Sequence, residues 1–201
     1  MNKHYLMRKP SISYAFALYD RSGSKVGVLT VGKPASHSLC VGLLGEDYSK
    51  KVYELNRFYT EDGLPKNTES YFLSGCLKLL KPYNLAIVSY ADTGMGHHGY
   101  IYQATNWLYT GRTKERTDKY TPGGKHSRHY TDRNKHLRKV RTAKERYVYF
   151  ACDRRTKSEY IKALNYEVKP YPKGNNERYE VGKFKAKTKV LNRKTGESWW
   201  E

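Results

Sequence analysis

The sequence predicts an α/β fold of the α+β kind, in which helices flank one mixed central sheet and a long basic insertion interrupts the chain. Three observations support this prediction. Runs rich in β-branched and aromatic residues alternate with helical runs over residues 13–111. A further strand-like run resumes at residues 147–151. Between the two, residues 112–146 contain many Lys and Arg and almost no aliphatic side chains. Strands and helices in this order form layers around one core.

The predicted sheet begins with a hairpin. Residues 13–20 and 25–32 have strand composition, and the turn residues Arg21-Ser-Gly-Ser24 join them. Residues 33–38 are then expected to be a loop. Residues 52–60 alternate with period two but carry mixed polarity on both sides, which is typical of a strand that borders a site.

A helix and a buried strand follow. Residues 68–80 place apolar side chains at helical spacing, and Asn67 is a good N-cap residue for that helix. The apolar residues 85–91 predict a buried strand. The remaining expected elements are a helix at 99–105, strands at 107–111 and 147–151, a short helix at 156–164, an extended segment at 166–172 and a basic hairpin within 178–201.

Charge narrows the classes of partner. The chain has 201 residues, a formal net charge of +19 and a pI near 9.7. A field of this sign concentrates polyanions, so nucleic acid is the favoured partner, with an anionic membrane surface as the competitor. No run approaches the roughly 20 apolar residues of a membrane span, and residues 1–5 lack a signal-peptide core. Three widely spaced cysteines predict neither a zinc knuckle nor a disulfide framework.

The basic insertion is the strongest nucleic-acid signal. Thirteen of the 35 residues 112–146 are Lys or Arg, against four acids. Such a segment buries too little apolar surface to fold alone, so we expect a long mobile arm. Its basic side chains can bind phosphates, and the interleaved Tyr120 and Tyr130 can stack on bases. The DNA-binding candidates are Lys114, Arg116, Lys125, Arg128, Arg133, Lys135, Arg138, Lys139 and Arg141.

Polar residues that are suited to acid–base chemistry or metal binding follow the buried strand 85–91. Asp92 ends the strand, His97 and His98 lie in a glycine-rich loop, and Tyr102 follows on the next helix. Loops at the carboxyl end of a buried strand can open a cleft. Two histidines and a carboxylate suit non-haem iron, and His37 can approach from another loop. The alternatives are an aspartate that caps a turn and a tyrosine that packs in the core.

The central run resembles one family, the Mom-type DNA-modification proteins of bacteriophages. The resemblance spans roughly residues 13–172, so residues 1–173 are read as one domain that includes the arm, and residues 174–201 as a basic C-terminal extension. Its sharpest pieces are Glu54-Leu-Asn-Arg57, Pro65-Lys-Asn-Thr-Glu-Ser70, Ser89-Tyr-Ala-Asp92, Gly96-His97, Tyr102-Gln-Ala-Thr-Asn-Trp107 and Tyr171-Pro-Lys173.

The resemblance implies an acetyltransferase-like (GNAT-like) fold that adds a carbamoylmethyl group to adenine in phage DNA. It implies an acetyl-CoA-type acyl donor, a link to iron through His37, Asp92, His97 and His98, and action in the cytoplasm of a bacterial host. Tyr102 would give a proton to the departing thiolate, and Asp92 would accept one from the adenine amine, with His37 as a third candidate catalytic residue. The residues implied to bind the cofactor are Arg57, Tyr59, Lys66, Asn67, Thr68, Ser70 and Asn106.

One departure from the GNAT pattern concerns the cofactor. The usual Gln/Arg-x-x-Gly-x-Gly/Ala loop is absent, and Leu64-Pro-Lys-Asn-Thr-Glu-Ser70 stands in its place. A helix N-terminus attracts phosphate through free amides and its dipole, but an ordinary helix cap has the same composition.

The expected substrate is double-stranded DNA with the target adenine flipped out, because a stacked base cannot reach such a cleft. Two other function classes stay open. One is an N-acetyltransferase acting on a protein or small-molecule amine, and the other is a non-catalytic DNA-binding protein.

Overall fold

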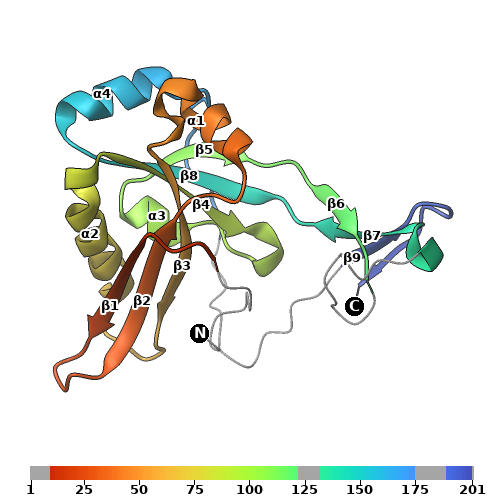
Figure 1. The fold of residues 1–201 in the computed structure, drawn as a ribbon. Coiled ribbons are helices and arrows are strands. Elements are labelled where there is room, and N and C mark those ends of the chain that lie inside the picture. The colour runs from red at the N-terminus through yellow and green to blue at the C-terminus, as the bar shows by residue number, and fades with distance from the viewer. Residues whose placement is uncertain (1–9, 122–131, 175–188, 201) are drawn as a thin grey trace.

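The computed structural model describes residues 10–121, 132–174 and 189–200. Its centre is a six-stranded sheet in the order β1-β2-β3-β4-β8-β5 (Figure 1). Neighbouring strands are antiparallel except for the parallel pair β3 and β4. The mixed sheet predicted from the sequence is therefore confirmed. The strands are β1 (Tyr14–Tyr19), β2 (Lys25–Gly32), β3 (Val52–Thr60), β4 (Leu85–Asp92), β5 (Leu108–Arg112) and β8 (Lys144–Ala151).

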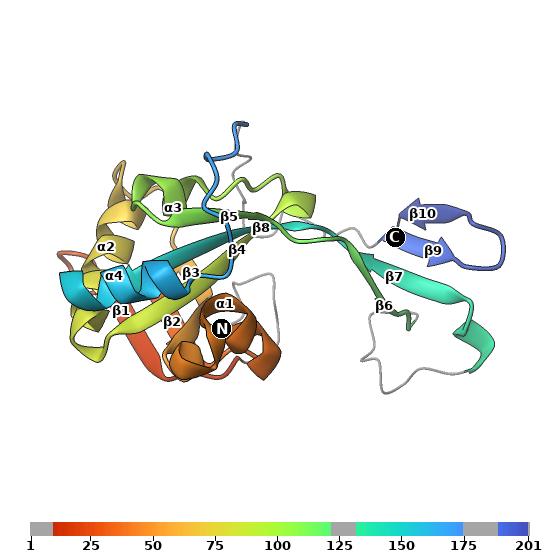
Figure 2. The same ribbon diagram turned by 90° about the horizontal axis from the view of Figure 1, so that it is seen from above.

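Helices cover both faces of this sheet (Figures 1 and 2). Helices α2 and α3 pack on one face, and α1 and α4 pack on the other, each pair over its own cluster of buried side chains. Below, the two sides are named the α2 face and the α1 face. The four helices are α1 (His37–Ser49), α2 (Thr68–Leu80), α3 (Tyr100–Ala104) and α4 (Arg154–Ala163).

Helix α2 forms where the apolar spacing predicts it. Leu73, Cys76, Leu77 and Leu80 are all buried against the sheet, and each leucine contributes roughly 1.5–3 kcal/mol by leaving water. Asn67 precedes the helix as expected, but its backbone is left-handed, with φ of 69°, and its side chain makes no capping hydrogen bond. The predicted position of the cap is right and the predicted capping chemistry is wrong.

Helix α1 is not predicted by the sequence pattern, which places residues 33–38 in a loop. The helix begins at His37, so that residue is helical and not part of a loop. A kink at Gly45, with φ of 73° and ψ of 177°, interrupts the helical backbone, and this break hides the helical period from a sequence reading. The apolar side chains that hold α1 on the sheet are Cys40, Leu43 and Leu44.

The basic arm forms regular structure by pairing with the C-terminal extension. A second sheet, here named the arm sheet, has the order β10-β9-β7-β6 and projects from the β5 and β8 end of the central sheet (Figures 1 and 2). The described part of the arm forms strands together with the C-terminal extension, and residues 144–146 belong to central strand β8. The strands of the arm sheet are β6 (Arg116–Lys119), β7 (Leu137–Arg141), β9 (Lys189–Asn192) and β10 (Ser198–Trp200).

Two further expectations concern thiols and membranes. Cys40, Cys76 and Cys152 are buried free thiols, as their spacing predicts. Among the helices of the described segments, none combines the length and apolar character that crossing a bilayer requires.

Candidate functional site

The central sheet opens between its two parallel strands. β3 and β4 pair only from Val52↔Ala86 to Glu54↔Val88, although β3 continues to Thr60 and β4 to Asp92. On its other side β3 stays paired with β2 through an irregularity where Thr30↔Arg57 is followed by Val31↔Leu55. We call this divergence the split. Backbone groups of β3 beyond Glu54 therefore lie outside the β3–β4 ladder.

A hydroxyl pair bridges the split on the α2 face. The Ser89 Oγ donates to the Leu55 carbonyl oxygen at 3.1 Å, which links β4 to β3 just beyond their last paired residues. The Tyr102 hydroxyl lies 2.8 Å from the same Ser89 Oγ. Helix α3 delivers Tyr102 to this position, and its ring packs on Trp107 and Tyr147 with centroids 5.0 and 5.1 Å away. Tyr102 is 9 % exposed, so it is a core residue that also presents its phenol at the split.

Asp92 is held at the end of β4 by three groups. Its Oδ1 accepts from the Gly94 amide at 3.0 Å and from the Thr142 hydroxyl at 2.6 Å. Its Oδ2 lies 3.4 Å from the Lys144 ammonium. The turn-capping alternative is therefore present in the structure, and the carboxylate also contacts the segment between β7 and β8.

Asp92 and Tyr102 lie on opposite faces of the central sheet. Side chains alternate along a strand, and Ala91 belongs to the cluster on the α2 face together with Tyr102. The neighbouring Asp92 therefore projects toward the α1 face. The register supports this placement, because Asp92 pairs with Lys144 while Ser89 pairs with the buried Tyr147 of the α2 face.

The segment that begins with Asp92 fixes the root of the arm. The Thr93 hydroxyl donates to the Ala143 carbonyl oxygen at 2.6 Å. A Cβ on Gly94 would lie 2.5 Å from the Thr142 Cγ2, so only glycine fits there without movement. Residues 142–143 are the link between β7 and β8, and they are thus clamped to the end of the strand that borders the split.

A second polar group on the α1 face was missed by the sequence reading. Burial raises the pKa of the Glu54 carboxyl, and the nearby Lys144 and Arg57 oppose that rise. Burial, with the charge of Glu54, raises the pKa of Tyr90 to about 12. The signal in the sequence was an acid at an inward position of a strand, two residues after the buried Val52. Glu54 is the last residue of β3 that pairs with β4, so its carboxyl lies where the split begins.

Four cofactor candidates gather at the exposed start of α2. The Thr68 hydroxyl donates to the Pro65 carbonyl oxygen at 2.7 Å, and the Ser70 hydroxyl donates to the Asn67 carbonyl oxygen at 3.0 Å. The Lys66 side chain is exposed. Glu69 adds an acidic group to the first turn.

The other three cofactor candidates lie elsewhere. Phe58 stacks on Phe72 of α2, with ring centroids 6.0 Å apart, so its strand neighbours Arg57 and Tyr59 project toward the opposite face. Asn106 is an exposed turn residue with φ of 60° between α3 and β5. The structure therefore brings Lys66, Asn67, Thr68 and Ser70 together but does not add the remaining three to them.

The predicted iron ligands are not assembled. His37 begins α1, where its Nε2 lies 3.9 Å from the Glu46 carboxylate. Asp92 has the partners described above, and His97 and His98 lie in the loop that precedes α3. Over the described ranges, no three His, Cys, Asp or Glu side chains group closely enough to hold a metal ion.

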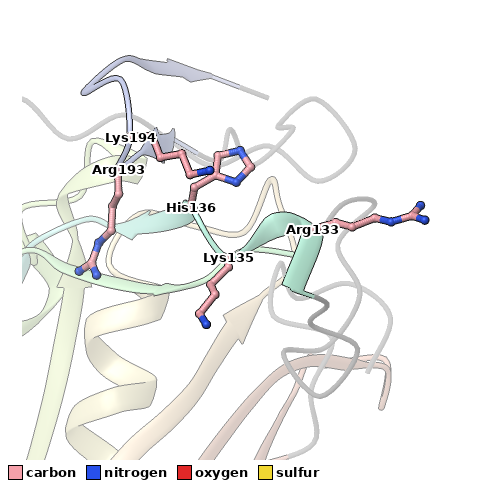
Figure 3. Close-up of a pocket in the computed structure, with 5 residues that line it drawn as sticks. All are labelled: Arg133, Lys135, His136, Arg193 and Lys194. Carbon is pink, nitrogen blue, oxygen red and sulfur yellow. The ribbon is translucent and has the colours of Figure 1, made fainter.

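The basic residues of the arm line a hollow on the arm sheet. Its volume is about 390 Å³, and Figure 3 shows two side chains from the β9–β10 turn and three from the segment that leads into β7. Of the predicted DNA-binding residues, Arg141 forms an ion pair with Asp118 at 3.4 Å. Lys125 and Arg128 lie outside the described residues. The hollow is lined by Arg133, Lys135, His136, Arg193 and Lys194.

Comparisons with known proteins bear on this arrangement. A family model described as the Mom protein family matches residues 1–173. The chain is also 33 % identical over 112 residues to the methylcarbamoylase mom of Escherichia phage Mu. That match covers 54 % of this chain and 46 % of the relative, so it spans about half the length of each protein. The family match includes the split, the Asp92 clamp and the arm, and leaves out β9 and β10. On the strength of that match, this chain belongs to the Mom protein family.

Proposed function

We propose that this protein is a DNA-modifying transferase that places a carbamoylmethyl group on the exocyclic amine of adenine and so protects phage DNA from host restriction. Membership of the Mom family and the name of the phage Mu relative support this proposal. The structural observation that carries it is the clamp between Asp92 and Thr142. It joins a strongly basic arm, suited to a polyanion, to the end of the strand that borders the split.

The proposed donor is an acyl-CoA-type molecule bound along the split, in a GNAT-like manner. The edge of β3 beyond Glu54 fits a pantetheine chain, because its backbone groups lie outside the β3–β4 ladder. The exposed start of α2, with Lys66 beside it, fits a pyrophosphate through its amides and its dipole. The carboxylate of Glu69, in the first turn of α2, repels that anion. In this proposal the ammonium group of Lys66 offsets the charge of Glu69.

A bound acyl-CoA would supply an acyl group that passes to the amine as the thiol leaves, and that step alone gives an N-acyl adenine. The carbamoylmethyl product requires a bond from the adenine nitrogen to a methylene carbon, so its formation needs a step beyond acyl transfer.

The residues around the split can move the protons that such a transfer requires. Tyr102 carries a hydroxyl at the divergence of the strands and can act as a proton donor. The adenine amine must lose a proton as its nitrogen forms the new bond. Asp92 and Glu54 both lie on the α1 face and are the candidate acceptors. Burial raises the pKa of the Glu54 carboxyl, which makes its carboxylate a stronger base than that of an ordinary glutamate.

The target base must leave the duplex to reach these groups. Extruding a base costs a few kcal/mol of stacking and pairing. A basic arm anchored beside the site can offset that cost by holding the flanking phosphates. In this proposal the arm sheet provides the affinity for DNA, and the central sheet provides the groups that transfer protons.

Mass spectrometry of nucleosides provides the direct test. DNA from cells that express the full chain is digested and compared with DNA from cells that express Tyr102→Phe. We expect a modified adenosine with the wild-type protein and roughly 10²-fold less of it with Tyr102→Phe. The wild type should also protect the plasmid from restriction enzymes that cut at adenine-containing sites. Unmodified DNA with acetylated protein or small amines would indicate an N-acetyltransferase. Unmodified DNA that still binds the protein tightly would indicate a non-catalytic DNA-binding protein.

A further inference from the structure

We propose that the C-terminal hairpin, β9 and β10, forms part of the DNA interface and that the hollow it shares with the arm binds a backbone phosphate. This inference rests on the proposed function for the identity of the nucleic acid. It concerns residues 189–200, which lie beyond the family match to residues 1–173. The sequence pattern alone assigns this extension no role.

The hairpin is built into the arm and is not a separate appendage. β9 pairs with β7 in antiparallel register from Leu137↔Asn192 to Val140↔Lys189. Beyond the last pair, the Arg193 amide donates to the His136 carbonyl oxygen at 2.7 Å. The β9–β10 turn is thereby held against the segment that enters β7, and the hollow lies at this junction.

The turn itself is ordered so that it presents its cations. The Lys194 amide donates to the Asn192 Oδ1 at 2.9 Å, and Gly196 adopts φ of 77° to close the turn. The acid that follows the turn, Glu197, accepts a hydrogen bond from the Thr195 hydroxyl at 3.0 Å and does not line the hollow. Because Glu197 does not line the hollow, the side chains of Arg193 and Lys194 can bind an anion from outside the turn.

The composition of the hollow matches a phosphate. Its lining contains two arginines, two lysines and one histidine, and no acid among the described residues. The four cationic side chains that line the hollow give it a positive potential, which favours a bound anion. Arginine binds phosphate in a bidentate way and lysine as a point charge, so the set suits a phosphodiester oxygen pair. The contribution of two chain segments makes the geometry specific to the paired arm sheet.

Two exposed tryptophans lie on β10 of the same hairpin. Trp199 is 38 % and Trp200 58 % exposed on edge strand β10. Trp200 pairs with Lys189, at the other end of β9 from the hollow. With a rise of about 3.3 Å per residue, the length of β9 from Lys189 to Asn192 is roughly 10 Å, or about three base-pair steps. A phosphate in the hollow and an aromatic contact at Trp200 can therefore engage one stretch of duplex.

A double-stranded DNA is the occupant that these features favour. The hollow offers charge without a deep apolar pocket, and the arm that carries it is clamped to the strand beside the split through Thr142 and Asp92. A protein interface has an apolar core rich in aromatic side chains, which the described lining of this hollow lacks. An anionic membrane attracts the same basic side chains, so vesicles are included in the test below. A duplex needs phosphates to be neutralised along a ridge.

The experiment measures binding of the full chain to a duplex of about 20 base pairs at several salt concentrations. The test variant carries Arg193→Gln and Lys194→Gln, and the matched control carries Lys157→Gln and Lys162→Gln on the exposed side of α4. We expect the test variant to bind more weakly, and the magnitude of the negative slope of log K against log salt to decrease by about 0.9 for each phosphate that is no longer neutralised. The control should keep the wild-type slope, although it gives up the same amount of charge.

A charge-preserving variant guards against a loss of folding. Arg193→Lys with Lys194→Arg keeps both cations and should retain the wild-type slope, with circular dichroism confirming that all variants fold. An identical slope for the Gln pair, the control and the wild type overturns the inference. The inference is also overturned if the Gln pair weakens binding to anionic vesicles or to another protein and leaves binding to DNA unchanged. The nucleoside analysis tests the proposed function separately, so adenine modification with unchanged binding would leave that function standing and remove the hairpin from the interface.

Discussion

The Tyr102 hydroxyl lies 2.8 Å from the Ser89 Oγ, at the point where the parallel strands β3 and β4 diverge. Ser89 has one proton, and it goes to the Leu55 carbonyl oxygen, so Tyr102 donates in this pair. A chain of two hydroxyls therefore runs from α3 across β4 to the backbone of β3. In the proposed reaction, the leaving group of a donor bound in the split replaces Ser89 as the acceptor of the tyrosine proton.

Removing the Tyr102 hydroxyl tests this assignment. Tyr102→Phe should lower adenine modification by roughly 10²-fold, the scale of a lost acid–base group, and reduce the free energy of unfolding by about 1 kcal/mol. The matched control is Tyr160→Phe, which removes another buried hydroxyl, bonded to the Asn84 carbonyl oxygen at 2.7 Å on the α1 face. Restriction protection of co-expressed plasmid and thermal unfolding are the measurements. Equal protection by both variants would make Tyr102 a packing residue.

Asp92 has two possible roles, and two substitutions separate them. Asp92→Asn keeps an oxygen for Gly94 and Thr142 but loses the negative charge beside Lys144. Asp92→Ala removes the clamp as well. We expect both to reduce modification by roughly 10²-fold and only Asp92→Ala to weaken duplex binding, since it alone frees the root of the arm. Full protection by Asp92→Asn would assign this residue to positioning alone.

Glu54 predicts a dependence of stability on pH. Its pKa is raised by burial, so the folded state retains a proton that the unfolded chain has already lost. The folded state therefore binds more protons between the ordinary glutamate pKa of about 4.3 and the raised value, and stability falls as pH rises through that window. Glu54→Gln should remove this component. The difference in melting temperature, variant minus wild type, should become more positive between pH 4 and pH 7, and a constant difference would contradict the raised pKa.

The start of α2 predicts a response to the donor. Acetyl-CoA should raise the melting temperature by mass action, and Ser70→Glu should abolish the rise by placing a negative charge in the first turn. Ser158→Glu in α4 adds the same charge away from the proposed site and should leave the rise intact. If the rise persists in Ser70→Glu, the donor binds elsewhere.

The elements that the sequence predicts well are those whose stability is local or apolar. The α2 stripe, the strand at residues 85–91 and the Asn192–Gly196 turn are readable because their residues meet one another within a few positions. Helix α1 escapes this reading because Gly45 breaks its backbone period. The pattern of the family motifs was enough to identify the family, which the match over residues 1–173 confirms.

The parts that the sequence could not predict depend on distant partners. The charged strand β7 has no apolar face that marks it as a strand, and it is held by β9, which lies about 50 residues later in the chain. Asp92 contacts Thr142 and Lys144, which are equally distant from it along the chain. The opposite faces of Asp92 and Tyr102 follow from strand alternation and helix placement together, so spacing along the chain could not assign them.

β5 continues into β6, and β7 continues into β8, so the length of these segments sets how far the arm sheet lies from the split. Residues 113–115 join one pair of strands and residues 142–143 join the other, so the distance from the split to the basic sheet is set by backbone rise. Adding one residue to each linker would lengthen the reach by about 3.3 Å but turn the opposite face of the arm toward the proposed duplex, because side chains alternate. Adding two would restore the face at a reach longer by about 6.6 Å.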